Sequence, residues 1–246
     1  MKKTSLFAAI FAAGAVFAAP GDYNTAVGPD DSRPCYRTVG LDFAYPIGVF
    51  TGNAVNNLGL NLFYGKRRSV YGIDLGLVSR VTGDVCGLQV NGGAAWIEGG
   101  CCGIGVSGLF NVRLDSSCGI DIASALNYTK GEFAGIQIAL VNIDGEFGGG
   151  QIGVYNHDRS GGAGFQLAVA NAAFNDFYGW SLGVVNCAER FAGLQFGVVN
   201  YAAENASGLQ LGVFNGAKNL AGVQIGVLNL ISTGAVPVLP VMNAQF

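Results

Sequence analysis

Apolar and polar residues alternate along most of the chain, in short units that each begin with a glycine. The late units show this most clearly: GLQFGVVN begins at Gly193, GLQLGVFN at Gly208 and GVQIGVLN at Gly222. When the glycine is counted as position one, positions two, four and six are apolar, and positions one, three and five are small or polar. A period of two predicts β-strands with one apolar and one polar face. Helices are excluded, because glycine this frequent would destabilise them.

Twelve such units follow one another at intervals of 13 to 16 residues, and this regular spacing predicts a repeat architecture. Asparagine closes seven successive units, where it can adopt left-handed backbone and cap a turn. The units begin at Gly59, Gly72, Gly87, Gly103, Gly119, Gly135, Gly149, Gly164, Gly179, Gly193, Gly208 and Gly222. The closing asparagines are Asn142, Asn156, Asn171, Asn186, Asn200, Asn215 and Asn229.

Two all-β folds can use such a unit. The favoured prediction is an antiparallel transmembrane β-barrel of about 14 short strands over residues 41–246, because bacterial outer-membrane barrels have an even number of strands. The alternative is a β-solenoid with about 15 residues per coil, in which the asparagines stack in a ladder and the glutamines form an exposed ladder.

The charges in the turns favour the barrel. One set of alternate turns holds two basic and six acidic residues, and the other set holds seven basic and four acidic residues. In a barrel the two sets lie on opposite sides of the membrane, whereas in a solenoid all of them lie on one edge. The chain also ends in Phe246 on an alternating strand, which resembles the terminal signal of outer-membrane barrel proteins, although Pro237 and Pro240 depart from that pattern.

The N-terminus has the pattern of an export signal. Lys2 and Lys3 precede an apolar run over residues 6–17, and Ala18 lies in a small-residue cleavage site. We therefore expect a signal peptide over residues 1–19 and a flexible leader over residues 20–40. Export and strands with one apolar face together predict a location in the cell outer membrane.

The repeat units resemble a known family. The units from Gly135 to Asn229 are similar to bacterial surface-repeat proteins built on a Gly-x-Gln-Ile-Gly-Leu-x-Asn motif. The stretch VYGIDLGLVSRVTGDVCGLQV, from Val70 to Val90, is similar to the leading hairpin of that family. The resemblance implies a location in the cell envelope and no established activity.

Composition narrows the function classes. Charged residues make up 12% of the chain, about half the fraction usual in soluble domains. Half of the residues are hydrophobic, which excludes a solvated disordered chain. A formal net charge of −3 argues against nucleic acid as a partner, because such proteins usually carry a basic face.

The barrel prediction yields a concrete function, which is an outer-membrane structural or pore-forming protein. Its polar face would line a lumen through which small polar solutes diffuse passively, and Asp74 and Asp121 would make that lumen mildly attractive to cations. The expected partners are outer-membrane lipids and the barrel-assembly machinery. The alternative is a surface-exposed solenoid that acts as a binding or adhesion module. The candidate lumen-lining residues are Asn61, Asp74, Gln89, Asp121, Gln137, Gln151, Gln166, Gln195, Gln210 and Gln224.

Catalytic and cofactor motifs are weak, so we expect no enzyme activity and no cofactor. His157 is the only histidine, and Ser160 is too close to it in sequence to form a convincing nucleophile and base pair. Gly103, Gly105 and Gly108 spell G-x-G-x-x-G, but another strand unit follows where a nucleotide site needs a helix.

Six cysteines lack C-x-x-C spacing, so we expect no metal site. Cys86, Cys102 and Cys118 each precede the glycine of a unit, at intervals of 16 residues. In a solenoid they would stack in adjacent coils and Cys86 could bond to Cys102, whereas in a barrel these two would lie too far apart. The other cysteines are Cys35, Cys101 and Cys187.

Aromatic residues gather near the ends of the predicted strands. They suit the interfacial girdles of a membrane barrel, and packing beneath the turns is an equally available explanation. These residues are Phe133, Phe147, Phe174, Phe177, Tyr178, Trp180, Phe191 and Tyr201.

Overall fold

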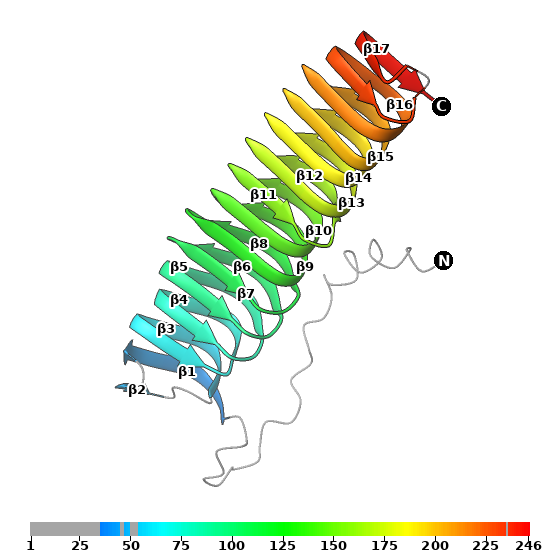
Figure 1. Ribbon diagram of the computed structural model, residues 1–246. Coiled ribbons are helices and arrows are strands. Elements are labelled where there is room, and N and C mark those ends of the chain that lie inside the picture. The colour runs from blue at the N-terminus through cyan, green and yellow to red at the C-terminus, as the bar shows by residue number, and fades with distance from the viewer. Residues whose placement is uncertain (1–34, 45–46, 50–53, 235) are drawn as a thin grey trace, which may run out of the picture.

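The computed structural model describes residues 35–44, 47–49, 54–234 and 236–246, and these residues form a rod of stacked coils (Figure 1). The predicted signal peptide and residues 20–34 of the predicted leader lie outside the described residues. The strands are β1 Cys35–Ala44, β2 Ile47–Val49, β3 Ala54–Arg67, β4 Ser69–Val81, β5 Val85–Ile97, β6 Cys101–Ser107, β7 Phe110–Arg113, β8 Ser117–Ala123, β9 Leu126–Ile138, β10 Val141–Ile152, β11 Tyr155–Asp158, β12 Gly162–Leu167, β13 Ala170–Leu182, β14 Val185–Phe196, β15 Val199–Leu211, β16 Phe214–Ile231 and β17 Val238–Gln245.

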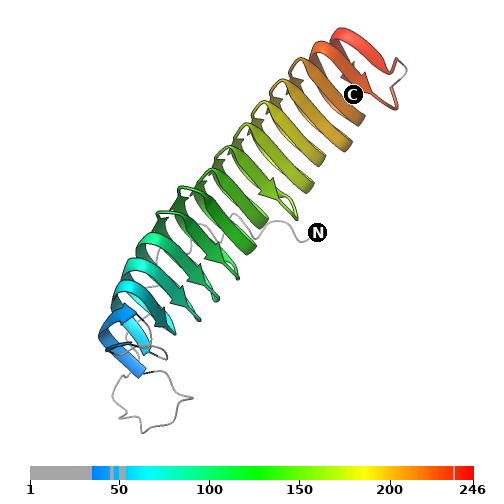
Figure 2. The same ribbon diagram turned by 60° about the vertical axis from the view of Figure 1, so that its left-hand side comes forward.

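The all-β class is confirmed, and the prediction of an antiparallel barrel is wrong. Successive coils from β3 to β16 pair in parallel, each residue lying over its equivalent in the coil before, as in Gly179 over Gly164 and Gly193 over Gly179. The result is a β-solenoid of about 12 turns, which was the alternative prediction. Figure 2 shows the coils following one another along the rod in sequence order.

Each repeat unit makes a complete coil because it contains two straight segments and two corners. In β14 the register with β13 shifts at one corner, between Ala188 and Arg190, and the chain leaves the strand at the other corner, at Gly197 and Val198. We call these the charged corner and the Gly-Val corner. A barrel would use one strand for each unit, whereas here the chain returns to its starting face within a single unit.

The alternating side chains are oriented opposite to those around an ordinary apolar core, with the polar ones inside and the apolar ones outside. In β14 the side chains of Asn186 and Gln195 are buried, while Phe196 is exposed. The glutamines therefore lie inside the solenoid, and the expectation that they would form an exposed ladder is wrong. The alternating apolar side chains lie on the outside, and a polar column replaces much of the apolar core.

Eleven glycines at position one form a continuous column from Gly72 to Gly222, with φ between 113° and 151°. A Cβ at Gly149 would lie 2.0 Å from the carbonyl oxygen of Gly135, so the backbones of neighbouring coils approach as closely as only glycine permits. Gly59, predicted to begin the first unit, lies outside this column: it pairs with Asp74, and Asn57 takes the place below Gly72.

Apolar packing inside the solenoid is concentrated beneath the charged corner. Phe133 stacks on Phe147 with 6.5 Å between ring centroids, and Phe177 stacks on Phe191 at 6.3 Å. All four rings are buried. They pack beneath the turns, so the girdle interpretation is wrong for them. Four of the predicted girdle residues are exposed: Phe174, Tyr178, Trp180 and Tyr201.

The difference in charge between alternate turns is explained by the stacking of neighbouring turns and not by the two sides of a membrane. In the solenoid the turns stack along the charged corner, where residues from neighbouring turns form ion pairs. Arg80 pairs with Glu98 at 2.6 Å, and Arg190 pairs with Asp176 in the coil before and with Glu204 in the coil after. Neighbouring turns therefore complement one another in charge, although solvent screens such exposed pairs and they add little to stability.

Both ends of the rod break the parallel pattern among the described residues. At the C-terminal end β17 pairs antiparallel with β16, and at the other end β2 pairs antiparallel with β1. Pro240 lies in β17, which the described pairings join to β16 alone, so proline occupies an edge strand where a missing N–H is tolerated.

Adjacent glycines in one coil provide a test of the glycine column. Gly149→Ala should lower the free energy of unfolding by about 2 kcal/mol or more, because its Cβ would meet the Gly135 carbonyl and its φ of 135° is strained for alanine. The matched control is Gly150→Ala, whose Cβ would meet only Ile136 Cγ1 at 3.9 Å. Urea unfolding followed by circular dichroism measures both variants, and equal midpoints would refute the role of the column.

Candidate functional site

The ten predicted lumen-lining residues are all buried inside the solenoid. Nine of them, from Asp74 to Gln224, occupy one register position along the rod, which forms a column, and Gly105 and Ser181 fill the same position in the two remaining coils. Asn61 lies beside this column, where its Oδ1 accepts a hydrogen bond from the N–H of Leu77 at 3.1 Å. These residues form part of the core, so the solenoid offers no lumen for them to line.

Amide hydrogen bonds link the glutamine column from coil to coil. Gln224 Nε2 donates to Gln210 Oε1 at 2.7 Å, and Gln210 Nε2 donates to Gln195 Oε1 at 2.6 Å. Such contacts remove the cost of burying the amide groups, because each donor keeps a partner that replaces water.

The asparagines form a second buried column, as the solenoid alternative predicted. Asn186 Nδ2 donates to Asn200 Oδ1 at 2.8 Å and to the carbonyl oxygen of Phe196 at 3.0 Å. The pattern recurs in an unbroken chain of bonds from Asn111 to Asn229. The asparagines therefore satisfy the backbone at the Gly-Val corner as well as each other.

Two buried arginines neutralise the carboxylates at the N-terminal end of the glutamine column. Arg67 lies 3.0 Å from Asp74 and 2.9 Å from Asp42, and Arg113 lies 2.9 Å from Asp121. Nothing in the local sequence around Arg113 distinguishes it from the exposed basic residues. Both arginines are fully buried, so removing either would leave a carboxylate unpaired inside the rod.

Asp144 and Asp158 differ, because the hydrogen-bond partners of these buried carboxyl groups are glutamine amides and, for Asp144, also the hydroxyl of Thr129. Asp158 lies over Asp144 in the next coil, and Gln151 Nε2 donates to Asp144 Oδ2 at 2.6 Å and to Asp158 Oδ1 at 3.1 Å. Burial raises the pKa of Asp144 to about 7, and burial with the neighbouring Asp144 charge raises the pKa of Asp158 well above its ordinary value. This segment of the core therefore prefers protonated carboxyl groups.

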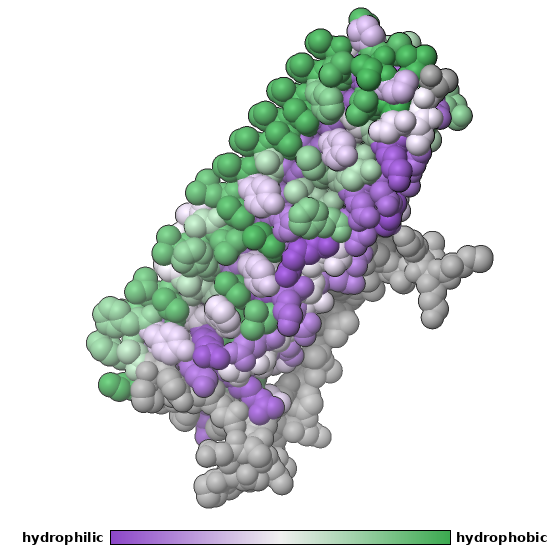
Figure 3. Space-filling model, in the orientation of Figure 1, coloured by the Kyte–Doolittle hydropathy of each residue, from purple (hydrophilic) through white to green (hydrophobic). Residues whose placement is uncertain are grey.

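The exterior of the solenoid carries a continuous apolar ridge along the Gly-Val corner. Figure 3 shows it as a hydrophobic band along one long side of the rod, with hydrophilic residues on another. At the corner, the exposed fraction of the side chains reaches 69% at Val227. The ridge consists of Leu75, Leu77, Val90, Leu109, Ile122, Ile138, Leu140, Ile152, Val154, Leu167, Val169, Val184, Phe196, Val198, Val213, Ile225 and Val227.

Exposed tyrosine and tryptophan side chains lie farther from the Gly-Val corner than the ridge residues do. On one face Trp180 and Tyr178 are two and four residues before Leu182, which pairs with the ridge residue Phe196 in the next coil. On the other face Trp96 and Tyr201 are exposed, one in the N-terminal half of the rod and one in the C-terminal half. Aromatic residues with a polar atom therefore lie on both sides of the ridge.

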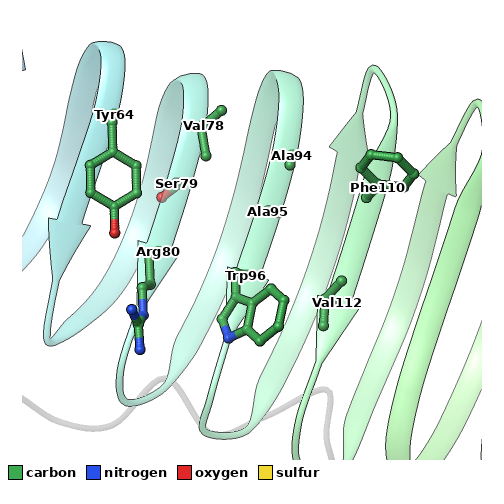
Figure 4. Close-up of a pocket in the computed structure, with 9 residues that line it drawn as sticks. All are labelled: Tyr64, Val78, Ser79, Arg80, Ala94, Ala95, Trp96, Phe110 and Val112. Carbon is green, nitrogen blue, oxygen red and sulfur yellow. The ribbon is translucent and has the colours of Figure 1, made fainter. Parts of the chain in front are cut away.

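A shallow groove of about 370 Å³ extends the apolar surface onto the second face near the N-terminal end (Figure 4). Neighbouring coils contribute its walls, and Trp96 and Arg80 lie next to each other in register. It is lined by Tyr64, Val78, Ser79, Arg80, Ala94, Ala95, Trp96, Phe110 and Val112.

His157 lies in β11 among aromatic rings. Its Nδ1 is 3.3 Å from the hydroxyl of Tyr155, and its ring meets Phe174 edge-on at 4.7 Å. Partial burial, and then the charge of Arg159, lower the pKa of His157. Within the described ranges no group of three histidine, cysteine or acidic residues is placed to hold a metal ion.

The cysteines stack as the solenoid alternative predicted, but with a different pair bonded. Cys86 lies over Cys102 and Cys102 over Cys118 in the register of the coils. The disulfide joins Cys102 and Cys118, whose Cα atoms are 4.7 Å apart, and Cys86 is an exposed free thiol.

The described residues thus define a class of protein, a β-solenoid with antiparallel end strands, a polar core and an apolar ridge. Comparisons of the chain with models of protein families, with curated proteins and with solved structures found no match. In the part of the chain that the structure describes, no helix is long and apolar enough to span a bilayer.

The buried Asp144 predicts an unusual dependence of stability on pH. Because its pKa is raised to about 7 in the fold, its stabilising effect is complete below about pH 4 and is lost as pH rises through 7. Asp144→Asn should reduce the fall in the free energy of unfolding between pH 4 and 7, measured by urea titration at several pH values. The control is Glu146→Gln, an exposed carboxylate in the same strand, which should leave the slope unchanged. An unchanged slope in Asp144→Asn would contradict this account.

Proposed function

We propose that the protein is a binding module of the cell envelope, a β-solenoid that lies on a lipid surface with its apolar ridge immersed. The observation that carries the proposal is the ridge, which is continuous over the length of the described solenoid. Soluble monomers rarely expose a contiguous apolar patch larger than about 300–600 Å², and larger patches mark docking sites for proteins or membranes.

The dimensions of the ridge suit the outer part of a bilayer. The corner row, represented by Val198, is two residues from the next row, represented by Phe196, and two residues of chain span at most about 7 Å. Apolar faces of proteins that lie in the membrane interface are immersed by about 5–10 Å. Along the rod, about 12 coils at the spacing of parallel strands extend roughly 55–60 Å.

The arrangement of aromatic and charged residues favours lipid over a second copy of the chain. Tryptophan and tyrosine gather where membrane proteins meet the headgroups, and here Trp180 and Trp96 lie beyond the ridge on its two sides. The ion pairs of Arg190 lie at the opposite, charged corner, which would face water. The exposed ridge is also convex, because it turns around a corner, whereas two flat faces would pack better in a dimer.

The hypothesis of a diffusion pore depended on a barrel, and its candidate residues belong to the core of the solenoid. The membrane partner expected from the sequence is retained here in another form. The protein would lie on the membrane and present its charged corner to the aqueous side.

Flotation with vesicles of zwitterionic phosphatidylcholine tests the proposal. The protein should float with the vesicles, and 0.5 M salt should leave the bound fraction unchanged, because apolar contact is not screened. The variant Val169→Glu with Val198→Glu should lose binding by about tenfold or more, since charged groups are costly in the hydrocarbon region.

The matched control adds the same two charges elsewhere, as Ser160→Glu with Ala203→Glu in exposed positions at the charged corner. It should bind vesicles like the original protein. Equal binding by both double variants, or no binding by the original protein, would refute the proposal. Light scattering without lipid tests the rival explanation, a dimer of two copies. If the original protein is a dimer and only the ridge variant is a monomer, the ridge binds a second copy of the chain.

A further inference from the structure

Three cysteines form a straight column on the outside of neighbouring coils. Cys86 in β5, Cys102 in β6 and Cys118 in β8 occupy equivalent positions, each directly before a glycine of the glycine column. The column continues with Tyr71 before Cys86 and Ala134 after Cys118, so no further sulfur extends it. The three sulfur atoms therefore form two neighbouring pairs, Cys86 with Cys102 and Cys102 with Cys118, which we call rungs. Only one rung can hold a disulfide at a time.

The two rungs are equivalent in backbone geometry. The Cα atoms of Cys102 and Cys118 are 4.7 Å apart, which is the ordinary spacing of neighbouring strands. Cys86 and Cys102 are neighbours in the same parallel register, so the rung between them has that spacing too. Disulfides span Cα distances of about 4.4–6.8 Å, and a bond between Cys86 and Cys102 therefore needs no movement of the coils.

The column also suits the approach that thiol–disulfide exchange requires. A thiolate attacks a disulfide sulfur from the side opposite the leaving sulfur, through three sulfurs in a row. Cys86 lies on one side of Cys102 along the rod, and Cys118 lies on the other side. The free thiol is exposed, so its thiolate form is hydrated and accessible.

We propose that Cys86, Cys102 and Cys118 form a thiol–disulfide exchange site in which the disulfide moves between the two rungs. The thiolate of Cys86 attacks Sγ of Cys102, so that the bond between Cys86 and Cys102 forms as the bond between Cys102 and Cys118 breaks. The Cys118 sulfur leaves with the electron pair of the broken bond and takes a proton from water. One disulfide is exchanged for another, and no external oxidant or reductant is consumed.

The other described free cysteines are placed differently. Cys101 is buried, and burial raises the pKa of its thiol to about 11, which keeps it protonated and unreactive at neutral pH. Cys187 lies far along the rod in β14, and burial raises the pKa of its thiol as well. These two thiols serve as internal references, because exchange within the column leaves them unchanged.

Disulfide mapping of the full chain tests the site. The protein is equilibrated without reductant at pH 8, quenched in acid, unfolded in acid and labelled with N-ethylmaleimide, and the peptides are identified by mass spectrometry. We expect the free thiol of the column to be divided between Cys86 and Cys118, with about one tenth or more on the minor site, and Cys102 to be bonded throughout.

A second experiment on the same protein measures exchange over time. When the native protein is held with iodoacetamide, the label should reach Cys118 as well as Cys86, because exchange frees the Cys118 thiol. Label on Cys86 alone in the native protein, together with free thiol on Cys86 alone after unfolding, would overturn the proposal.

Variants add an independent check that does not depend on the kinetics. Cys118→Ser should contain a disulfide between Cys86 and Cys102 after air oxidation, and Cys187→Ser should give the same mixture as the original protein. Circular dichroism establishes that each variant keeps its strands. A folded Cys118→Ser protein with free thiols at both Cys86 and Cys102 would refute the equivalence of the rungs.

Discussion

The close approach of neighbouring backbones at the glycine column is the constraint on which the rest of the structure depends. A Cβ at Gly193 would lie 2.0 Å from the carbonyl oxygen of Gly179, and each coil from Gly72 to Gly222 likewise needs a glycine at this position. That requirement fixes the register from the glycine through the Gly-Val corner, up to the shift at the charged corner. Because the register is fixed, asparagine lies over asparagine and glutamine lies near glutamine, and their amides can bond along the rod.

The amide columns explain why the apolar residues are outside. A narrow coil has room for few inner side chains, and the identical amides of Asn186 and Asn200 satisfy each other only when they are stacked. The leucines, isoleucines and valines then occupy the alternate positions, which face outward. The polar core and the apolar ridge are thus two results of one alternation.

This relation also determines how much the sequence could predict. The period of two, the repeat length and the all-β class follow from residues such as Gly193, Leu194 and Gln195, and the structure confirms them. The same alternation fits a barrel strand and a solenoid strand, so it could not decide between them, and the weighting of the turn charges favoured the wrong one. The ion pairs of Arg190 with residues of the two neighbouring coils show why: those turns lie along one edge.

The site residues divide in a similar way. The glutamines share one repeat position, so the sequence identified them as one set. It did not identify them as core residues, because core side chains are usually apolar and the burial of these amides depends on partners in other coils. Arg113 was missed as a core residue because its partners Asp121 and Gln89 are distant in sequence. The cysteine spacing predicted the stack correctly, since equal spacing in a solenoid is equal position, but spacing alone could not select the bonded rung.

The antiparallel strands at the two ends have a consequence for assembly. A parallel coil leaves open hydrogen-bonding groups on which another coil, or another copy, could continue the stack. β17 covers that edge of β16 with a strand of opposite direction, and β2 does so beside β1. Where these strands pair, at Gly222–Leu230 of β16 and Leu41–Ala44 of β1, a foreign coil finds a template of opposite polarity, which disfavours stacking of a second copy on those segments.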